Sequence, residues 1–325
     1  MFNSKILVGD VLVMLGTLED ASVDCVVTSP PYWGLRDYQV EGQIGLEPTL
    51  SEFVATMVKV FREVARVLKP TGTVWLNLGD TYAGSWGNSG SRQGGQREVN
   101  ADRLYRKAWD NHTERPPSSL KQDGLKPKDL CGMPWRVAFG LQDDGWYLRQ
   151  EIIWHKPNPM PESVRDRCTK AHESIFLLAH PESGGKYYYD ADAVRERHKE
   201  PWRSTGNAET GGLIGNASGM KRIFDRRQYN PLGRNKRSVW TITTKPYSQA
   251  HFATFPPELP RTCIQAGCPE GGTVLDPFAG AGTTLLVANQ LQRHAIGIEL
   301  NPEYAAMAEQ RIYGEAPLLN QVAVI

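Results

Sequence analysis

The stretch "TVLDPFAGAGTT" (Thr273–Thr284) decides the fold of this chain. It reads as an apolar strand, a turn with two glycines, and the start of a helix. Glycines at 280 and 282 would let the backbone approach a ligand closely at the head of that helix. "AIGIE" (Ala295–Glu299) predicts the following strand. A strand, turn, helix and strand in this order predict an α/β fold with a largely parallel sheet.

The glycine turn favours a nucleoside ligand without phosphates. A dinucleotide fingerprint would carry a third glycine where this chain has Leu285, and no GK[ST] follows the turn. A carboxylate at Glu299, the end of the next strand, suits the two hydroxyls of a ribose. S-adenosylmethionine meets these conditions. We expect it to contact Asp276, Pro277, Phe278, Gly280, Gly282, Thr283, Thr284 and Glu299.

Further candidates for this cofactor lie elsewhere in the chain. Asp10 follows a predicted strand at 5–9 and would either meet the adenine or cap a helix. His251 and Phe252 begin "HFATFPPEL", which we place beside the methionine end of the cofactor. A structural hydrogen bond is the favoured role for His251, with general base as the alternative.

A second motif, "TSPPYWGL" (residues 28–35), begins at the end of a predicted strand at 24–29. Pro30 and Pro31 fix φ near −65° and supply no N–H, so this turn presents carbonyl oxygens. Ser29 adds a hydroxyl acceptor and Tyr32 an aromatic face. For Trp33 packing in the core is favoured, with a second stacking role as the alternative. Apolar spacing predicts a helix over 51–70 that Ser51 caps and Pro70 ends; strands are predicted at 73–80, 147–156 and 173–180.

Composition and charge narrow the possible partners. The chain has 325 residues and a net charge of +1, yet residues 195–237 hold eleven Lys and Arg against four acids. This basic block predicts a face for a polyanion, or equally a solvated loop with its counter-charges elsewhere. No CxxC pair indicates zinc, so no metal is expected. No apolar run is long enough for a membrane span and no signal peptide is recognisable, so a cytoplasmic location is expected.

"TSPPYW" together with "DPFAGAGTT" resembles the DNA methyltransferases that modify cytosine N4 or adenine N6. The order of the motifs matches the circularly permuted β class. The resemblance covers about residues 4–80, 130–190 and 238–313. It implies a Rossmann-like methyltransferase fold with a mostly parallel, seven-stranded sheet and an inserted target-recognition region. The implied division is a first catalytic part (1–190, with a mobile insertion at 84–129), a target-recognition region (191–240) and a cofactor-binding part (241–325).

The resemblance also implies a mechanism. An exocyclic amine is a poor nucleophile, so acceptors must take its N–H hydrogens, and Ser29 Oγ and the Pro30 carbonyl suit this task. The target base would flip out of the duplex and stack on Tyr32, while Pro31 keeps the turn rigid. S-P-P-Y resembles the cytosine-N4 enzymes, and Asp or Asn at the first position is commoner among adenine enzymes. Cytosine N4 is therefore favoured, with adenine N6 as the alternative.

Double-stranded DNA is the expected substrate, and a cognate restriction endonuclease is a further expected partner. No membrane association is expected, and a monomer or a homodimer would serve. Carbon-5 methylation is set aside because the chain has no Pro-Cys dipeptide. An RNA or protein-glutamine amine methyltransferase and a non-enzymatic DNA-binding protein remain competing readings. DNA phosphates and base edges are expected to meet Arg222, Arg226, Arg227, Arg234, Lys236 and Arg237.

Overall fold

The computed structural model describes residues 2–35, 38, 40–83, 124–197, 230–244, 255–315 and 320–325. These residues fall into two compact units, one of Met1–Tyr189 with Ser238–Ile325 and the other of Asp190–Arg237. The bounds of the second unit lie close to those of the expected target-recognition region, whose role stays a prediction. Most of the expected insertion, residues 84–123, lies outside the described residues.

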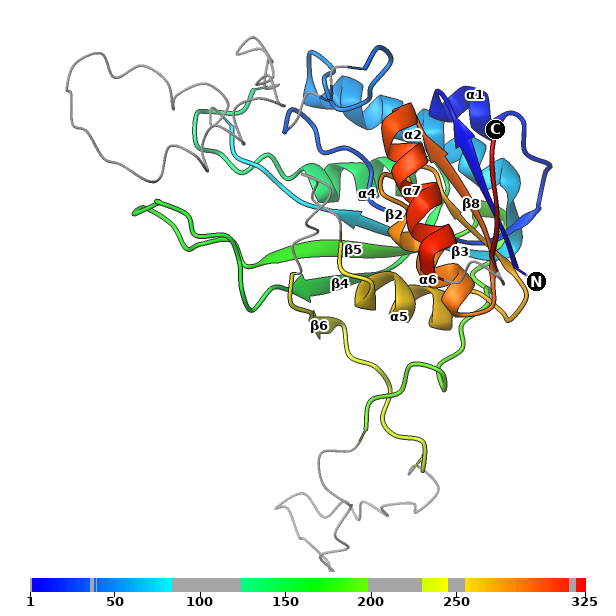
Figure 1. Ribbon diagram of the computed structural model, residues 1–325. Helices are drawn as coiled ribbons and strands as arrows, with labels where there is room; N and C mark the ends of the chain where they lie inside the picture. The colour runs from blue at the N-terminus through cyan, green and yellow to red at the C-terminus, as the bar shows by residue number, and fades with distance from the viewer. Residues whose placement is uncertain are drawn as a thin grey trace, which may run out of the picture. The chain divides into compact units, whose positions relative to one another are not determined.

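The larger unit is built on one sheet whose strands run in the order β6-β4-β5-β3-β2-β7-β8-β1-β9 (Figure 1). Only β5 runs antiparallel to its neighbours, β3 and β4; every other pair is parallel. The strands are β1 (Phe2–Val8), β2 (Val23–Thr28), β3 (Leu68–Leu78), β4 (Tyr147–His155), β5 (His172–Ala179), β6 (Val239–Thr241), β7 (Thr273–Asp276), β8 (His294–Glu299) and β9 (Asn320–Val324).

The sheet is mostly parallel, as expected, but its described part has nine strands rather than seven. The additional strands are β6 and β9, which lie at the two edges of the sheet. Their sequences, "VWT" and "NQVAV", are too short to show the alternation by which a strand is recognised. They are strands because their backbones pair with neighbouring strands, β6 with β4 and β9 with β1.

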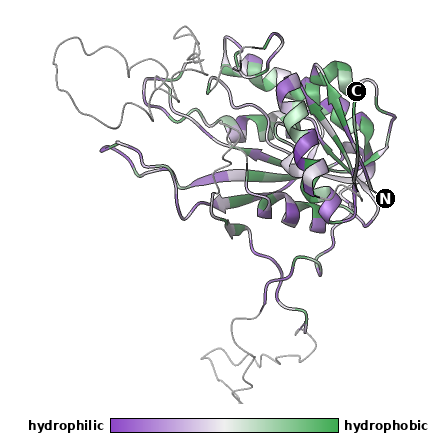
Figure 2. Cartoon of the chain, in the orientation of Figure 1, coloured by the Kyte–Doolittle hydropathy of each residue, from purple (hydrophilic) through white to green (hydrophobic). Residues whose placement is uncertain are grey.

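Helices cover both faces of the sheet, giving three layers (Figure 1). Helices α1 (Val11–Leu15), α2 (Leu50–Val67) and α4 (Met133–Asp143) pack together on one face. Helices α5 (Glu258–Gly267), α6 (Thr283–Gln290) and α7 (Pro302–Glu315) pack on the other, and a short 3-10 turn, η1, spans Pro181–Ser183. Figure 2 shows hydrophobic residues on the central strands and hydrophilic stretches on the outer helices.

Helix α2 shows how the sequence specifies this packing. Its buried side chains recur at three- and four-residue spacing and face the core, among them Phe53, Met57 and Phe61. The expected cap at Ser51 is wrong: Thr49 caps the helix, and its hydroxyl and the Glu52 carboxylate form a reciprocal capping box. The helix ends at Val67, ahead of Pro70.

The topology brings the two sequence motifs together. Strands β2 and β7 are parallel neighbours, with Cys25 opposite Val274 and Val26 opposite Leu275. The turn that begins at Ser29 and the glycine turn that follows Asp276 therefore leave the same edge of the sheet side by side. This is the edge at which open α/β sheets bind ligands.

Gly282 provides a test of the packing at this edge. Its φ is +73°, and an added Cβ would lie 2.8 Å from the Cβ of Ala308 in α7. We expect Gly282→Ala to lower the free energy of unfolding by about 2–4 kcal/mol in urea titrations, from left-handed strain and overpacking. Gly314→Ala, in α7 itself, is the matched control, because an added Cβ there meets nothing within 4 Å. Equal stabilities of the two variants would contradict this account.

Candidate active site

A buried carboxylate fixes the centre of the site. Thr28 Oγ1 donates to Asp276 Oδ1 at 2.7 Å, and Thr284 Oγ1 donates to Asp276 Oδ2 at 2.7 Å. The backbone N–H of Phe278 also donates to Oδ1, at 3.1 Å. Burial raises the pKa of Asp276 to about 6, although these hydrogen bonds oppose the shift. Asp276 therefore ties the end of β2 to the glycine turn and the start of α6.

Two further carboxylates hold the backbone at the same edge. Glu299 accepts hydrogen bonds from the backbone N–H groups of Gly280 (2.8 Å) and Asn301 (2.9 Å). Burial raises the pKa of this carboxyl, and the backbone hydrogen bonds oppose the rise. Asp10 caps α1 by accepting from the N–H groups of Leu12 and Val13. The capping role considered for Asp10 is thus present in the structure.

One cavity opens between the glycine turn and the proline turn. Asp10 and Glu299 both line it in addition to holding the backbone. A cofactor and the atom that receives its methyl group could therefore meet within a single space. The sequence-predicted residues that line it are Asp10, Ser29, Pro30, Pro31, Tyr32, Asp276, Pro277, Phe278, Gly280, Thr283 and Glu299.

Two predicted cofactor residues, Gly282 and Thr284, do not line the cavity. Gly282 packs against Ala308, and Thr284 is fully buried with its hydroxyl committed to Asp276. Both residues support the turn in the described geometry, and contact with the cofactor stays a prediction for them. His251 and Phe252 lie outside the described residues.

Sequence reasoning missed several residues of the cavity wall. The segment after the proline turn contributes six of them, and its irregular sequence carries no motif that could have identified it. Phe255, from the "HFATFPPEL" element, and Tyr304 of α7 add aromatic rings. The segment's lining residues are Leu35, Tyr38, Val40, Gly42, Gln43 and Ile44.

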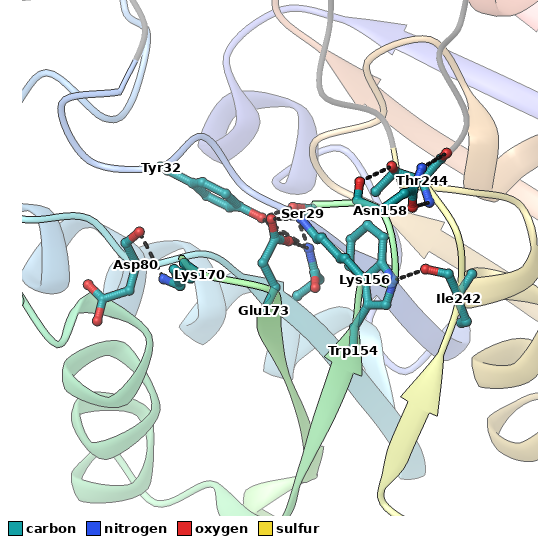
Figure 3. Close-up of polar contacts among 11 residues, drawn as sticks. Ser29, Tyr32, Asp80, Trp154, Lys156, Asn158, Lys170, Glu173, Ile242 and Thr244 are labelled. Atoms are coloured by element: carbon teal, nitrogen blue, oxygen red, sulfur yellow. Dashed lines mark hydrogen bonds and ion pairs between the residues drawn. The ribbon is translucent and has the colours of Figure 1, made fainter. Parts of the chain in front are cut away.

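The side chains of the proline turn join a polar network (Figure 3). The Tyr32 hydroxyl donates to Glu173 Oε2 at 2.9 Å and lies 3.3 Å from Ser29 Oγ. The Asn77 amide donates to the same Glu173 oxygen at 2.9 Å, and Lys156 Nζ forms an ion pair with Glu173 Oε1. Burial, followed by the Glu173 charge, raises the pKa of Tyr32 well above its usual value, so the phenol keeps its proton.

Trp33, the next residue of the turn, is fully buried and its indole N–H donates to the Glu47 carbonyl at 2.9 Å. The expected packing role is therefore confirmed. Tyr32 is half-buried, and its ring packs so closely on Gly79 that an added Cβ there would lie 2.6 Å from Tyr32 Cε2. The turn thus has one anchor in the core and one ring at the cavity.

The basic block is described only in part. Arg234 and Arg237 both pair with Glu196, through Nε to Oε2 distances of 3.1 and 3.0 Å. These two arginines therefore have a counter-charge inside the block itself. Lys236 is also described, whereas Arg222, Arg226 and Arg227 lie outside the described residues. Contact with DNA stays a prediction for all six.

The described ranges contain neither a candidate metal site nor a candidate membrane-spanning helix. No group of His, Cys, Asp and Glu side chains there is arranged to hold a metal ion. Among the described helices, none has the length and apolarity that a bilayer crossing requires.

Comparison with known proteins identifies the family. Residues 23–310 match the family described as DNA methylase, the N6/N4 methyltransferases. The type II methyltransferase M.XycI of Xanthomonas campestris pv. cyanopsidis is 47% identical over 313 residues, which cover 96% of this chain and 89% of that protein. M.SmaI of Serratia marcescens, also a type II methyltransferase, is 46% identical over 310 residues, covering 95% of this chain and 91% of its own.

Solved structures agree with this assignment. A protein of Thermus thermophilus, described as a DNA modification methylase and complexed with S-adenosyl-L-methionine, matches with a TM-score of 0.58 at 25% identity, covering 99% of both chains. The cytosine-N4-specific PvuII DNA methyltransferase shares the fold, with a TM-score of 0.61 at 18% identity over 99% of this chain and 95% of its own.

The chain belongs to the N6/N4 DNA methylase family, among its type II methyltransferases. The predicted family, α/β fold class and S-adenosylmethionine cofactor are confirmed. The enzyme is an S-adenosylmethionine-dependent DNA methyltransferase. This excludes the competing interpretations, an RNA or protein-glutamine amine methyltransferase and a non-enzymatic DNA-binding protein.

The buried Asp276 gives a pH-dependent test of this site. Because its pKa is raised in the folded state, the native protein binds more protons than the unfolded chain between about pH 4 and pH 6. Proton binding by Asp276 therefore stabilises the folded state. This stabilisation is fully present below the pKa that Asp276 has in the unfolded chain, and it is lost as the pH rises through 6. The stability of wild type relative to Asp276→Asn should therefore fall by up to about 3 kcal/mol from pH 4 to pH 7. Urea titrations that give a pH-independent difference would contradict the assignment.

Proposed function

We propose that this enzyme transfers a methyl group from S-adenosylmethionine to the exocyclic N4 amine of cytosine in double-stranded DNA. The observation that carries the choice of base is Ser29, a hydroxyl rather than a carboxylate or amide, at the start of the proline turn and in the cavity wall. Adenine N6 is the alternative, because serine also occurs at this position among adenine enzymes.

The cavity offers groups suited to the cofactor. Phe278 and the glycine turn line one side, and Glu299 is the proposed partner of the ribose hydroxyls. Each Glu299 oxygen already accepts one backbone hydrogen bond, and a carboxylate oxygen retains a second lone pair for a hydroxyl. Gly280 leaves open space where a Cβ would stand, which is compatible with close approach of a ligand. Asp10 is the proposed neighbour of the adenine.

The proline turn is the proposed methyl-acceptor site. Ser29 Oγ and the Pro30 carbonyl would accept the two amine hydrogens, which draws the nitrogen lone pair out of conjugation with the ring. Tyr32 would support the flipped base by stacking, and Pro31 restricts the turn. Placing the amine in line with the cofactor's methyl group supplies most of the catalysis.

The second unit, Asp190–Arg237, is the proposed contact with DNA. Its arginines could exchange Glu196 for DNA phosphates, and that exchange would make binding sensitive to salt. Pairing with a cognate restriction endonuclease, a cytoplasmic location, and action as a monomer or homodimer are further expectations of this proposal.

The choice of base has a direct test. The enzyme is incubated with unmethylated bacterial genomic DNA and isotope-labelled cofactor, and the digested nucleosides are separated by mass spectrometry. We expect labelled N4-methylcytosine. Labelled N6-methyladenine would overturn the choice of base and leave the class of enzyme unchanged.

The proposed division of labour predicts opposite effects of two substitutions. Tyr32→Ala should remove most methyl transfer, at least about 100-fold, and leave cofactor affinity nearly unchanged. Glu299→Ala should weaken cofactor binding about 10-fold or more, through loss of the charge-assisted hydrogen bonds. Isothermal titration with S-adenosylhomocysteine and a labelled-methyl transfer assay measure the two properties. Loss of cofactor binding in Tyr32→Ala, or unchanged affinity in Glu299→Ala, would refute the division.

A further inference from the structure

The polar network behind the proline turn draws on four adjacent strands. Sheet order places β4, β5, β3 and β2 side by side. Lys156 follows β4, Glu173 lies near the start of β5, Asn77 lies near the end of β3, and Ser29 follows β2. Because β5 is antiparallel to both neighbours, its first residues reach the edge where β3 and β4 end.

Glu173 is the point at which these groups meet (Figure 3). Its Oε2 accepts from the Tyr32 hydroxyl and the Asn77 amide, both at 2.9 Å. Its Oε1 pairs with Lys156, whose ammonium also lies 4.3 Å from the centre of the Trp154 ring. The side chains of Glu173 and Lys156 are only 16% and 18% exposed, so this pair is shielded from solvent.

The hydrogen bonds of this network have a defined direction. A carboxylate paired with an ammonium can only accept, so the single proton of the Tyr32 hydroxyl is committed to Glu173. The contact between Ser29 Oγ and Tyr32 Oη can then form only with Ser29 as the donor. Asn77 Nδ2 reinforces this direction by donating towards Ser29 Oγ (3.3 Å) and Tyr32 Oη (3.0 Å). The serine proton is thus held inside the protein.

We infer that Glu173 is a positioning residue for methyl transfer: acting through Tyr32, it turns Ser29 into a hydrogen-bond acceptor and fixes the plane of the Tyr32 ring. With its own proton directed at Tyr32, Ser29 Oγ keeps a lone pair for an amine hydrogen of the target base. The Tyr32 ring is held at its hydroxyl by Glu173 and along its side by Gly79. This inference rests on the acceptor roles proposed for Ser29 and Tyr32.

The placement of Asn77 supports a functional reading of the network. Asn77 is 2% exposed, and its Oδ1 has no hydrogen-bond partner within the described part of the chain. An unsatisfied buried oxygen costs stability, so an apolar residue would serve a purely structural strand better. The amide group instead directs its N–H groups to Ser29, Tyr32 and Glu173.

A double-mutant cycle tests the inference. The single-turnover rate of methyl transfer is measured with saturating labelled cofactor and unmethylated bacterial genomic DNA, for wild type, Glu173→Gln, Tyr32→Phe and the double variant. Each single substitution should lower the rate about 10- to 100-fold, as loss of a hydrogen bond to a charged group does. Because Glu173 acts through the Tyr32 hydroxyl, the double variant should be no more than about twofold slower than the slower single variant.

Glu151→Gln is the matched control. Glu151 lies on β4 beside β5, and its Oε1 accepts from Ser174 Oγ at 2.8 Å, outside the network. This variant should transfer methyl groups at the wild-type rate, and all variants should bind S-adenosylhomocysteine with wild-type affinity. A Glu173→Gln rate within twofold of wild type, or losses that multiply in the double variant, would overturn the inference.

Two further comparisons keep the test decisive. If Glu173→Gln lowers the melting temperature, Tyr32→Phe carries the test, since it removes only the hydroxyl; a wild-type rate in Tyr32→Phe would overturn the inference. Nucleoside analysis of the wild-type product separates this inference from the proposed base. N6-methyladenine would contradict the choice of cytosine, and the cycle would still decide the role of Glu173.

Discussion

The site depends on the buried carboxylate of Asp276. Through Thr28 it holds the end of β2, where the proline turn begins, and through Thr284 it holds the start of α6 behind the glycine turn. Two hydroxyls and the backbone N–H of Phe278, all neutral donors, satisfy this carboxylate. Because no counter-ion among the described residues offsets its burial, the pKa of Asp276 is raised. This burial has an electrostatic cost, but it holds the glycine turn and the proline turn in one fixed arrangement.

Beside this anchor, two further carboxylates at the sheet edge hold the backbone and also line the cavity. Asp10 caps α1, and Glu299 holds Gly280 and Asn301, so both carboxylates are oriented before a ligand arrives. In the proposed mechanism, the Glu173 network holds the proline turn in the same way. Catalysis by positioning requires such preorganisation, because small displacements of the reacting atoms are costly in rate.

The sequence predicted the parts of the site that are local in the chain. The glycine turn, the proline turn and the strands that carry them are contiguous, so spacing and residue type identify them. The contact between Tyr32 and Glu173 joins residues 141 positions apart, and Glu173 lies near the start of a strand, where no ligand site is normally sought. Gly282 and Thr284 belong to the motif, yet only the packing of α6 against α7 and β2 shows that they support the turn. The edge strands β6 and β9 depend on pairing that short segments do not encode.

The central claim is that one cavity brings the cofactor and the flipped base together across the Asp276 anchor. A crystal structure of the enzyme with S-adenosylhomocysteine and a duplex containing its target tests this claim most directly. We expect the cofactor sulfur beside the glycine turn, the base out of the duplex against Tyr32, and the base's amine nitrogen within hydrogen-bond distance of Ser29 Oγ. A target base that remains stacked in the duplex, or an amine directed away from Ser29, would contradict the account.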